Sequence, residues 1–204
     1  ATPMADTSRL KMPAKLAERA RALVAAEATG DLDWTPPPVR DAATVVMVRD
    51  QPDGLHIYLQ RRVRTMAFAA GMYVFPGGAV EPQDVERAQE LMSATPHIAD
   101  LPFAARPTVS PGEDTLAVRI AAVRETLEET SHDLGDPVAL EFVGHWVTPE
   151  VEDRRFDTRF YAAPLPTGQD LTTLTSEHQA IGWFRPQDAL TLPMLPPTAA
   201  TLAE

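Results

Sequence analysis

The sequence has no cysteine and no long apolar run, and each absence excludes a class of protein. Without cysteine there is no disulfide scaffold, no zinc–thiolate site and no cysteine nucleophile. The lack of disulfides fits a reducing compartment, and we expect a cytoplasmic protein. No stretch approaches the roughly 18 apolar residues that a membrane-spanning helix needs.

Basic residues are scarce relative to acidic ones. The 204 residues include 18 Lys or Arg and 29 Asp or Glu, which gives a formal net charge of −11. An acidic surface repels both phosphate backbones and anionic lipids, so neither nucleic acid nor a membrane is an expected partner. An anionic substrate would need metal cations or local arginines to approach this protein.

Proline, with 20 residues, marks the joints of the chain. We expect an N-terminal helical extension over 1–40, with a helix at 13–28, followed by one domain over 41–204. The hydrophobic pattern predicts strands near 42–48, 55–59, 72–75, 139–147, 156–163 and 180–184, and helices near 84–93, 114–131 and after Pro186. This mixed order of strands and helices indicates an α+β fold around a single core.

The helix expected over 114–131 carries three glutamates on one side. Glu125, Glu128 and Glu129 fall within about 100° of arc. The apolar stripe expected to face the core consists of Leu116, Ile120, Val123 and Leu127. A solvated acidic surface is the simplest interpretation of the glutamates, but like charges at this spacing destabilise a helix, and the helix dipole disfavours them near its C-terminal end. A hard divalent cation would relieve both penalties, so a metal site is the alternative.

The segment Arg124-Glu125-Thr126-Leu127-Glu128-Glu129, with Gly77-Gly78 upstream, resembles the Nudix hydrolase signature G-x5-E-x7-R-E-U-x-E-E-x-G-U. The resemblance implies an α/β/α sandwich with a mixed sheet between helices, and hydrolysis of a diphosphate linkage.

The segment departs from the signature in its spacing. The signature places its arginine 14 residues after the second glycine, whereas Arg124 follows Gly78 by 46 residues. An insertion of about 32 residues, near 85–112, is therefore expected. The residues that could replace the first glutamate of the signature are Asp84, Glu113 and Asp114, and Ser131 stands in place of its closing glycine.

A split signature resembles the acyl-CoA diphosphatase-like branch of the Nudix hydrolases. Residues 59–62 with 71–78, 154–160 and 195–198 also resemble that branch, although Ala67 stands where the coenzyme A pattern has an arginine. The resemblance implies coenzyme A or an acyl-CoA as substrate. The alternatives are ADP-ribose, a nucleotide sugar or a dinucleotide as substrate, or a module that binds a nucleotide without hydrolysing it.

The resemblance also implies a role for each signature residue. Glu128 and Glu129, with the main-chain carbonyl of Gly77, would bind Mg²⁺ or Mn²⁺. Glu125 would bind metal or accept the proton of the attacking water, and Arg124 would orient Glu125 through a charge-assisted hydrogen bond.

Several residues outside the signature are weaker candidates. Glu177 lies six residues before Trp183, where some Nudix enzymes carry a late acid, although it could equally be an ordinary loop residue. The arginines that could bind substrate phosphate, or simply lie in solvent, are Arg61, Arg62, Arg64, Arg154, Arg155 and Arg159. In a strand, Arg155 and Arg159 share a face and could act together.

The remaining candidates are expected to be structural. Trp146 and Trp183 are expected in the core, with stacking against a substrate as the alternative, and the five histidines show no metal-ligand spacing. The helix within 1–40 is a candidate element of a homodimer or of a lid.

Overall fold

The computed structural model describes residues 14–30, 33–63, 69–103, 112–165, 168, 171 and 178–203. Three positions singled out in the sequence, Arg64, Ala67 and Glu177, lie outside the described residues.

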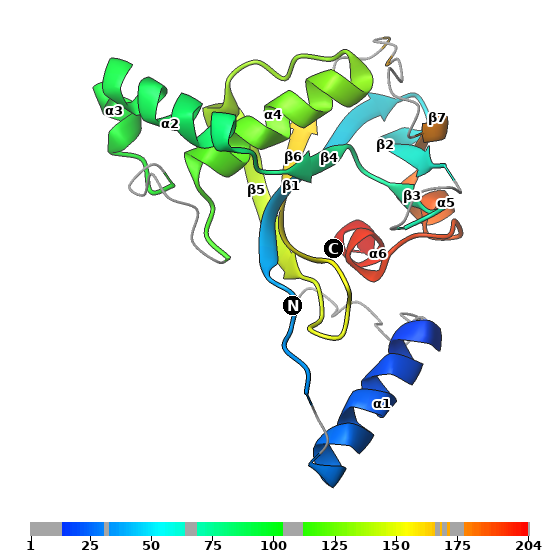
Figure 1. Ribbon diagram of the computed structural model, residues 1–204. Coiled ribbons are helices and arrows are strands. Elements are labelled where there is room, and N and C mark those ends of the chain that lie inside the picture. The colour runs from blue at the N-terminus through cyan, green and yellow to red at the C-terminus, as the bar shows by residue number, and fades with distance from the viewer. Residues whose placement is uncertain are drawn as a thin grey trace, which may run out of the picture.

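A mixed sheet of seven strands forms the centre of the described structure (Figure 1). The strands are β1 (Val39–Gln51), β2 (Gly54–Arg62), β3 (Tyr73–Val74), β4 (Gly77–Ala79), β5 (Glu141–Val147), β6 (Arg155–Pro164) and β7 (His178–Phe184). Their order is β3-β2-β1-β6-β5, with β4 paired to β1 and β7 paired to β2. Strands β1 and β6 run parallel, and the other pairs are antiparallel. The strands predicted near 42–48 and 55–59 form a hairpin, in which Gln51 pairs with Gly54 across a two-residue turn.

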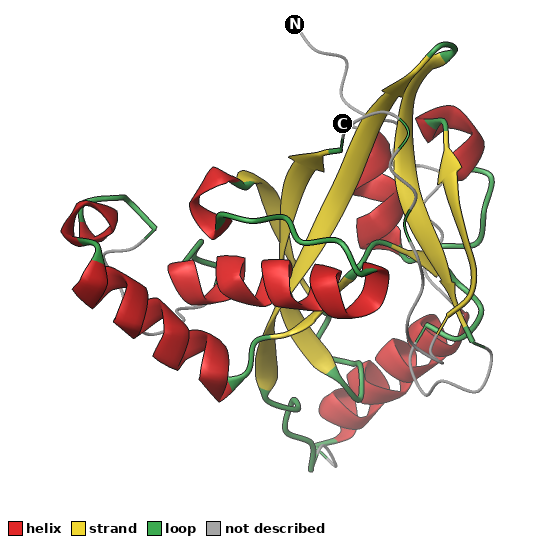
Figure 2. Ribbon diagram, turned by 90° about the horizontal axis from the view of Figure 1, so that it is seen from above, coloured by secondary structure: helices red, strands yellow, loops and turns green. Residues whose placement is uncertain are grey.

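Helices cover both faces of this sheet (Figure 2). They are α1 (Ala14–Thr29), α2 (Pro82–Ala94), α3 (Pro96–Ala99), α4 (Leu116–Thr130), α5 (Pro186–Ala189) and α6 (Pro196–Ala203), with a short 3₁₀ helix, η2 (Pro137–Ala139). Alternation along β1 separates two cores: Val45 and Met47 pack toward α4, whereas Val46 packs in a second cluster with Ala189 of α5. The predicted α/β/α sandwich is therefore confirmed.

Helix α1 lies beside the sandwich rather than within it (Figure 1). Its Arg19 forms an ion pair with Asp153, in the loop between β5 and β6, at 2.5 Å. The helix predicted at 13–28 is thus present, and its part in a dimer or lid remains a prediction. Among the described residues, no helix is both long and apolar enough to span a membrane.

Helix α4 packs on the sheet with a different face from the predicted one. Its buried side chains include Val118, Ala121 and Ala122, whereas Leu127 is 43% exposed. Small side chains let the helix approach β1 and β4 closely. The larger Leu116 packs against α2 instead, in a separate cluster. The predicted stripe was therefore wrong at its C-terminal end, where Leu127 has no core to enter.

Ser131, which replaces the closing glycine of the signature, ends α4 in the left-handed region with φ of 58°. A residue with a Cβ atom is strained there, and glycine is not. We expect Ser131→Gly to raise the free energy of unfolding by about 0.5–1 kcal/mol, measured by urea denaturation. Gly135, at φ of 76° with open space around it, provides the reverse control. Gly135→Ser should lower the free energy of unfolding by a similar amount. Destabilisation by Ser131→Gly would contradict the strain argument.

Candidate active site

Two adjacent glycines bring strand β4 against helix α4. Gly77 has φ of 152°, and a Cβ atom there would collide with the carbonyl oxygen of Ala43 on β1. A Cβ atom on Gly78 would collide with the carboxylate of Glu125. Only glycine permits this close approach, so the Gly77-Gly78 pair creates the space that the Glu125 carboxylate occupies.

Glu129 is the most buried of the three helix glutamates, at 7% exposure. One of its oxygens, Oε2, accepts hydrogen bonds from the main-chain N–H of Gly77 at 3.0 Å and from Nε2 of Gln60 at 2.5 Å. Burial raises the pKa of Glu129 to about 7, against the lowering effect of those two donors. The negative charge of Glu125 raises it further.

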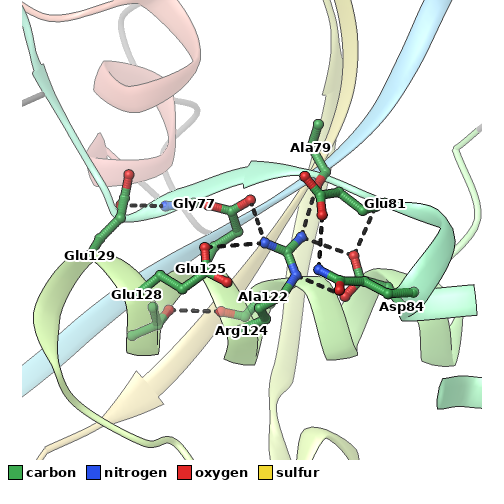
Figure 3. Close-up of polar contacts among 11 residues, drawn as sticks. Gly77, Ala79, Glu81, Asp84, Ala122, Arg124, Glu125, Glu128 and Glu129 are labelled. Atoms are coloured by element: carbon green, nitrogen blue, oxygen red, sulfur yellow. Dashed lines mark hydrogen bonds and ion pairs between the residues drawn. The ribbon is translucent and has the colours of Figure 1, made fainter. Parts of the chain in front are cut away.

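Arg124 joins the helix glutamates to the upstream half of the signature (Figure 3). Its guanidinium donates to Oε1 of Glu125 at 2.9 Å and to the carbonyl oxygen of Ala79 at 3.1 Å. On the other side it donates to both carboxylate oxygens of Asp84, each at 2.9 Å. The hydrogen bonds that Arg124 donates to Asp84 raise the pKa of Arg124, so the guanidinium stays charged. The predicted orienting contact between Arg124 and Glu125 is present.

The structure places only one of the three alternatives for the first signature glutamate next to Arg124. Asp84 is buried and also accepts a hydrogen bond from the N–H of Glu81 at 2.8 Å. Asp114 is instead paired with Arg119, with 2.6 Å between Oδ2 and Nη2, and the carbonyl of Glu113 accepts from Arg159. Asp84, in the first turn of α2, is therefore the alternative that contacts Arg124, and the rest of α2 and then α3 follow before the chain returns to α4.

A cleft of about 510 Å³ opens beside the glutamates. Glu125, Glu129 and the Gly77-Gly78 pair line one end of it, and residues 148–149, 152, 154 and 195–198 line other parts. Other side chains that line the cleft are Arg40, Arg62, Trp146, Arg154, Phe156 and Thr158. A carboxylate group at the end of a long, partly apolar cleft suits an elongated substrate with an anionic reacting centre.

The arginines predicted to bind substrate divide into two groups. Arg62 lines the cleft, and its charge lowers the pKa of Glu129. Arg159 is fully buried, with its guanidinium bonded to Asp41 and to the carbonyl oxygen of Glu113. Its predicted role in substrate binding, alone or with Arg155, is therefore wrong, because strand alternation turns it toward the core.

Two more of the predicted arginines, Arg155 and Arg61, also point away from the cleft. Arg155 donates to the carbonyl oxygens of Thr148 and Pro37, and Arg61 to that of Gly71. Neither residue lines the cleft, whereas Arg154 does.

Sequence reasoning missed or misplaced two residues that line the cleft and one that holds Glu129. Trp146 was expected in the core but is 40% exposed and lines the cleft, whereas Trp183 packs on Tyr58 as expected. Gln60, which holds Glu129, and Arg40 were not identified. Gln60 could have been found from the sequence, because a polar residue in the apolar part of a strand indicates a buried hydrogen-bond partner.

The side chains as they stand do not enclose a metal ion. No group of three or more His, Cys, Asp or Glu residues in the described part of the chain is arranged to hold one. Glu125 is engaged by Arg124, and Glu129 by Gly77 and Gln60. The donor set nevertheless fits a hard cation, because it offers carboxylate oxygens in a partly buried place: burial, and then the charge of a neighbouring glutamate, raises the pKa of both Glu125 and Glu129. Glu128, with a side chain 55% exposed, lies at the outer edge of this set.

The raised pKa of Glu129 predicts how the stability of the metal-free protein depends on pH. A carboxyl whose pKa is near 4.5 in the unfolded chain and about 7 in the folded one stabilises the fold below pH 4.5. That contribution is lost as the pH rises through 7. We expect the free energy of unfolding, measured with chelator present, to fall by about 3 kcal/mol between pH 4.5 and 7.5 from this group. Glu129→Gln should flatten the profile by that amount, and identical profiles for both proteins would contradict the assignment.

Comparison with known proteins identifies the fold and the domain. A model of the NUDIX domain matches residues 107–204, and no curated protein matches the chain. The crystal structure of a NUDIX hydrolase from Alicyclobacillus acidocaldarius superposes with a TM-score of 0.64 at 27% identity, over 81% of this chain and 90% of that one.

More distant structures share the same fold. The binary complex of a C. elegans Ap4A hydrolase superposes with a TM-score of 0.52 at 18% identity, covering 80% of this chain and 93% of that one. The NUDIX domain of Shewanella oneidensis NrtR, complexed with ADP ribose, superposes with a TM-score of 0.54 at 13% identity, covering 87% and 93%. Residues 107–204 thus match the NUDIX domain, the described chain folds as the Nudix α/β/α sandwich, and the protein is a hydrolase of phosphorus-containing anhydrides.

Proposed function

We propose that the chain hydrolyses the diphosphate linkage of coenzyme A or an acyl-CoA, using Mg²⁺ or Mn²⁺. The observation that carries the proposal is that Glu125 and Glu129 line a cleft of about 510 Å³ whose other walls are largely apolar. A diphosphate at the glutamate end would leave the rest of the substrate to fill the cleft.

The proposed reaction assigns a task to each residue around the glutamates. Glu125, Glu128, Glu129 and the carbonyl of Gly77 would hold the divalent cation, which when bound neutralises the diphosphate and lowers the pKa of a bound water. Arg124 donates a hydrogen bond to the Glu125 carboxylate, which would either bind the cation or accept the proton of the attacking water. The water oxygen forms a bond to one phosphorus as the bond from that phosphorus to the bridging oxygen breaks.

Two features of the cleft support a coenzyme A substrate. Arg40 and Arg154 line the cleft and could meet an additional phosphate, such as the 3′-phosphate of coenzyme A. Leu195, Pro196 and Pro197, from the stretch that resembles the acyl-CoA diphosphatase-like branch, provide an apolar wall for a pantetheine or acyl chain. The proposal also includes a catalytic role for Glu177. It treats the segment after Asp84 as an insertion in the domain and residues 1–40 as an extension of it.

A hydrolysis panel tests the substrate. The protein is incubated with Mg²⁺ or Mn²⁺ and with coenzyme A, acyl-CoAs, ADP-ribose, NADH or diadenosine polyphosphates, and products are separated by chromatography. Release of 3′,5′-ADP from coenzyme A is the expected result, and chelation of the metal should abolish it. A clear preference for ADP-ribose or a dinucleotide would replace coenzyme A by that substrate. Absence of turnover on every compound, with nucleotide binding unchanged in Glu129→Gln, would indicate a binding module instead.

A further inference from the structure

The indole of Trp146 occupies an unusual place for so large an apolar side chain. Trp146 lies near the end of β5, at the edge of the sheet, and is 40% exposed. Its neighbour His145 lies beside Gly112, on the side from which the chain enters α4. Since successive side chains in a strand point to opposite faces, Trp146 points away from α4, toward the cleft that it lines.

Strand pairing places Trp146 at one end of a row of small side chains. Trp146 pairs with Thr158 on β6, Thr158 with Ala42 on β1, and Ala42 with Ala79 on β4. All four residues line the cleft, and Ala79 is adjacent to Gly78, against which the Glu125 carboxylate lies. The row therefore forms a low floor running from the glutamates to the indole.

The length of this floor suits a nucleotide. Three strand spacings separate β4 from β5, which amounts to about 14 Å. An extended nucleoside diphosphate has a similar length, with its base at one end and its phosphates at the other. Phe156, two residues before Thr158 on the same face of β6, adds a second aromatic ring near Trp146.

We infer that Trp146 is the stacking surface for the base of the nucleotide substrate. The inference rests on the proposed function for the kind of substrate, and it assigns the base-binding end of the cleft. A flat indole beside a floor of small residues accepts a planar ring, whereas the phosphates lie at the opposite, carboxylate end.

Fluorescence provides a test that does not depend on turnover. The chain has three tryptophans, so Trp34→Phe with Trp183→Phe leaves Trp146 as the only one. With metal chelated, ADP and 3′,5′-ADP should quench the fluorescence of this variant. Ribose 5-phosphate and inorganic pyrophosphate, which lack a base, should not. Equal quenching by all four compounds, or by none, would overturn the inference.

Kinetics provide the second test, on whichever substrate of the panel is hydrolysed. Trp146→Ala should raise KM about tenfold, within the roughly 5- to 150-fold range that loss of one base stack produces, and leave kcat within about threefold. Trp146→Phe should restore most of the affinity. The matched control is Val143→Ala, because Val143 is equally exposed on β5 but does not line the cleft. An unchanged KM in Trp146→Ala would overturn the inference. If the oligomeric state of that variant also changed, the indole would instead be covered by a second copy of the chain.

The two proposals can fail separately. Base-dependent quenching without hydrolysis of coenzyme A would uphold Trp146 and refute the proposed substrate. Hydrolysis of coenzyme A with no effect of Trp146→Ala on KM would uphold the proposed substrate and refute the role of Trp146.

Discussion

Replacing Glu129 by glutamine is expected to lower kcat/KM by about 10³-fold while leaving the fold intact. The amide oxygen of glutamine can still accept the hydrogen bonds that Gly77 and Gln60 donate to the carboxylate. What the variant loses is the negative charge, and with it the proposed ligand for the divalent cation. Because that charge is buried, its removal should also keep or raise the stability of the metal-free protein at pH 7.5. Activity and stability are therefore expected to move in different directions.

Steady-state kinetics and urea denaturation on the same preparation measure both quantities. Glu86→Gln on α2 is the matched control, since it makes the same substitution at an exposed site. The control should change neither quantity by more than about 0.5 kcal/mol in free energy. A loss of activity below tenfold in Glu129→Gln would argue against Glu129 as a metal ligand, and a large loss of stability would point to a structural role instead.

The second large effect is expected at the ion pair between Asp84 and Arg124. Asp84→Ala should lower the free energy of unfolding by about 3–4 kcal/mol, because it leaves a largely buried guanidinium without its bidentate partner. The midpoint of thermal unfolding should fall by about 10 °C. Activity should fall as well, since Arg124 is then free to move away from the position in which it holds Glu125.

Two further variants make this result specific. Glu90→Ala breaks the exposed pair between Arg87 and Glu90 and should cost less than about 1 kcal/mol. Asp84→Asn can still accept the hydrogen bond from the N–H of Glu81. Its loss of unfolding free energy should therefore lie between those of Asp84→Ala and Glu90→Ala. If Asp84→Ala is no more destabilising than Glu90→Ala, the pair does not hold the two halves of the signature together.

Local rules of the chain were enough to predict the carboxylate face. Helical periodicity alone places Glu125, Glu128 and Glu129 on one side of α4, whatever surrounds the helix. The hydrophobic pattern likewise predicted the strands near 42–48 and 55–59 and the mixed order of strands and helices. The same rules were insufficient for the helix stripe, because Leu127 obeys the periodicity but has no neighbour to pack against.

The partner of Arg124 could not be chosen from the sequence. Asp84, Glu113 and Asp114 all stood close to the signature position, and the insertion made their spacing ambiguous. The structure decides among them because Arg119 and Tyr161 bind Asp114, which leaves Asp84 to meet Arg124 across 40 residues of chain.

The sequence by itself thus determined the reaction class, through side chains whose relative placement depends on one helix and one glycine-containing strand. Only the tertiary structure decided which side chains reach the cleft. Alternation shows that neighbouring residues of a strand lie on opposite faces, but not which face is covered. Arg159 proved to be fully buried and Trp146 to be open to the cleft, because α4 packs against one side of the sheet and Trp146 points to the other.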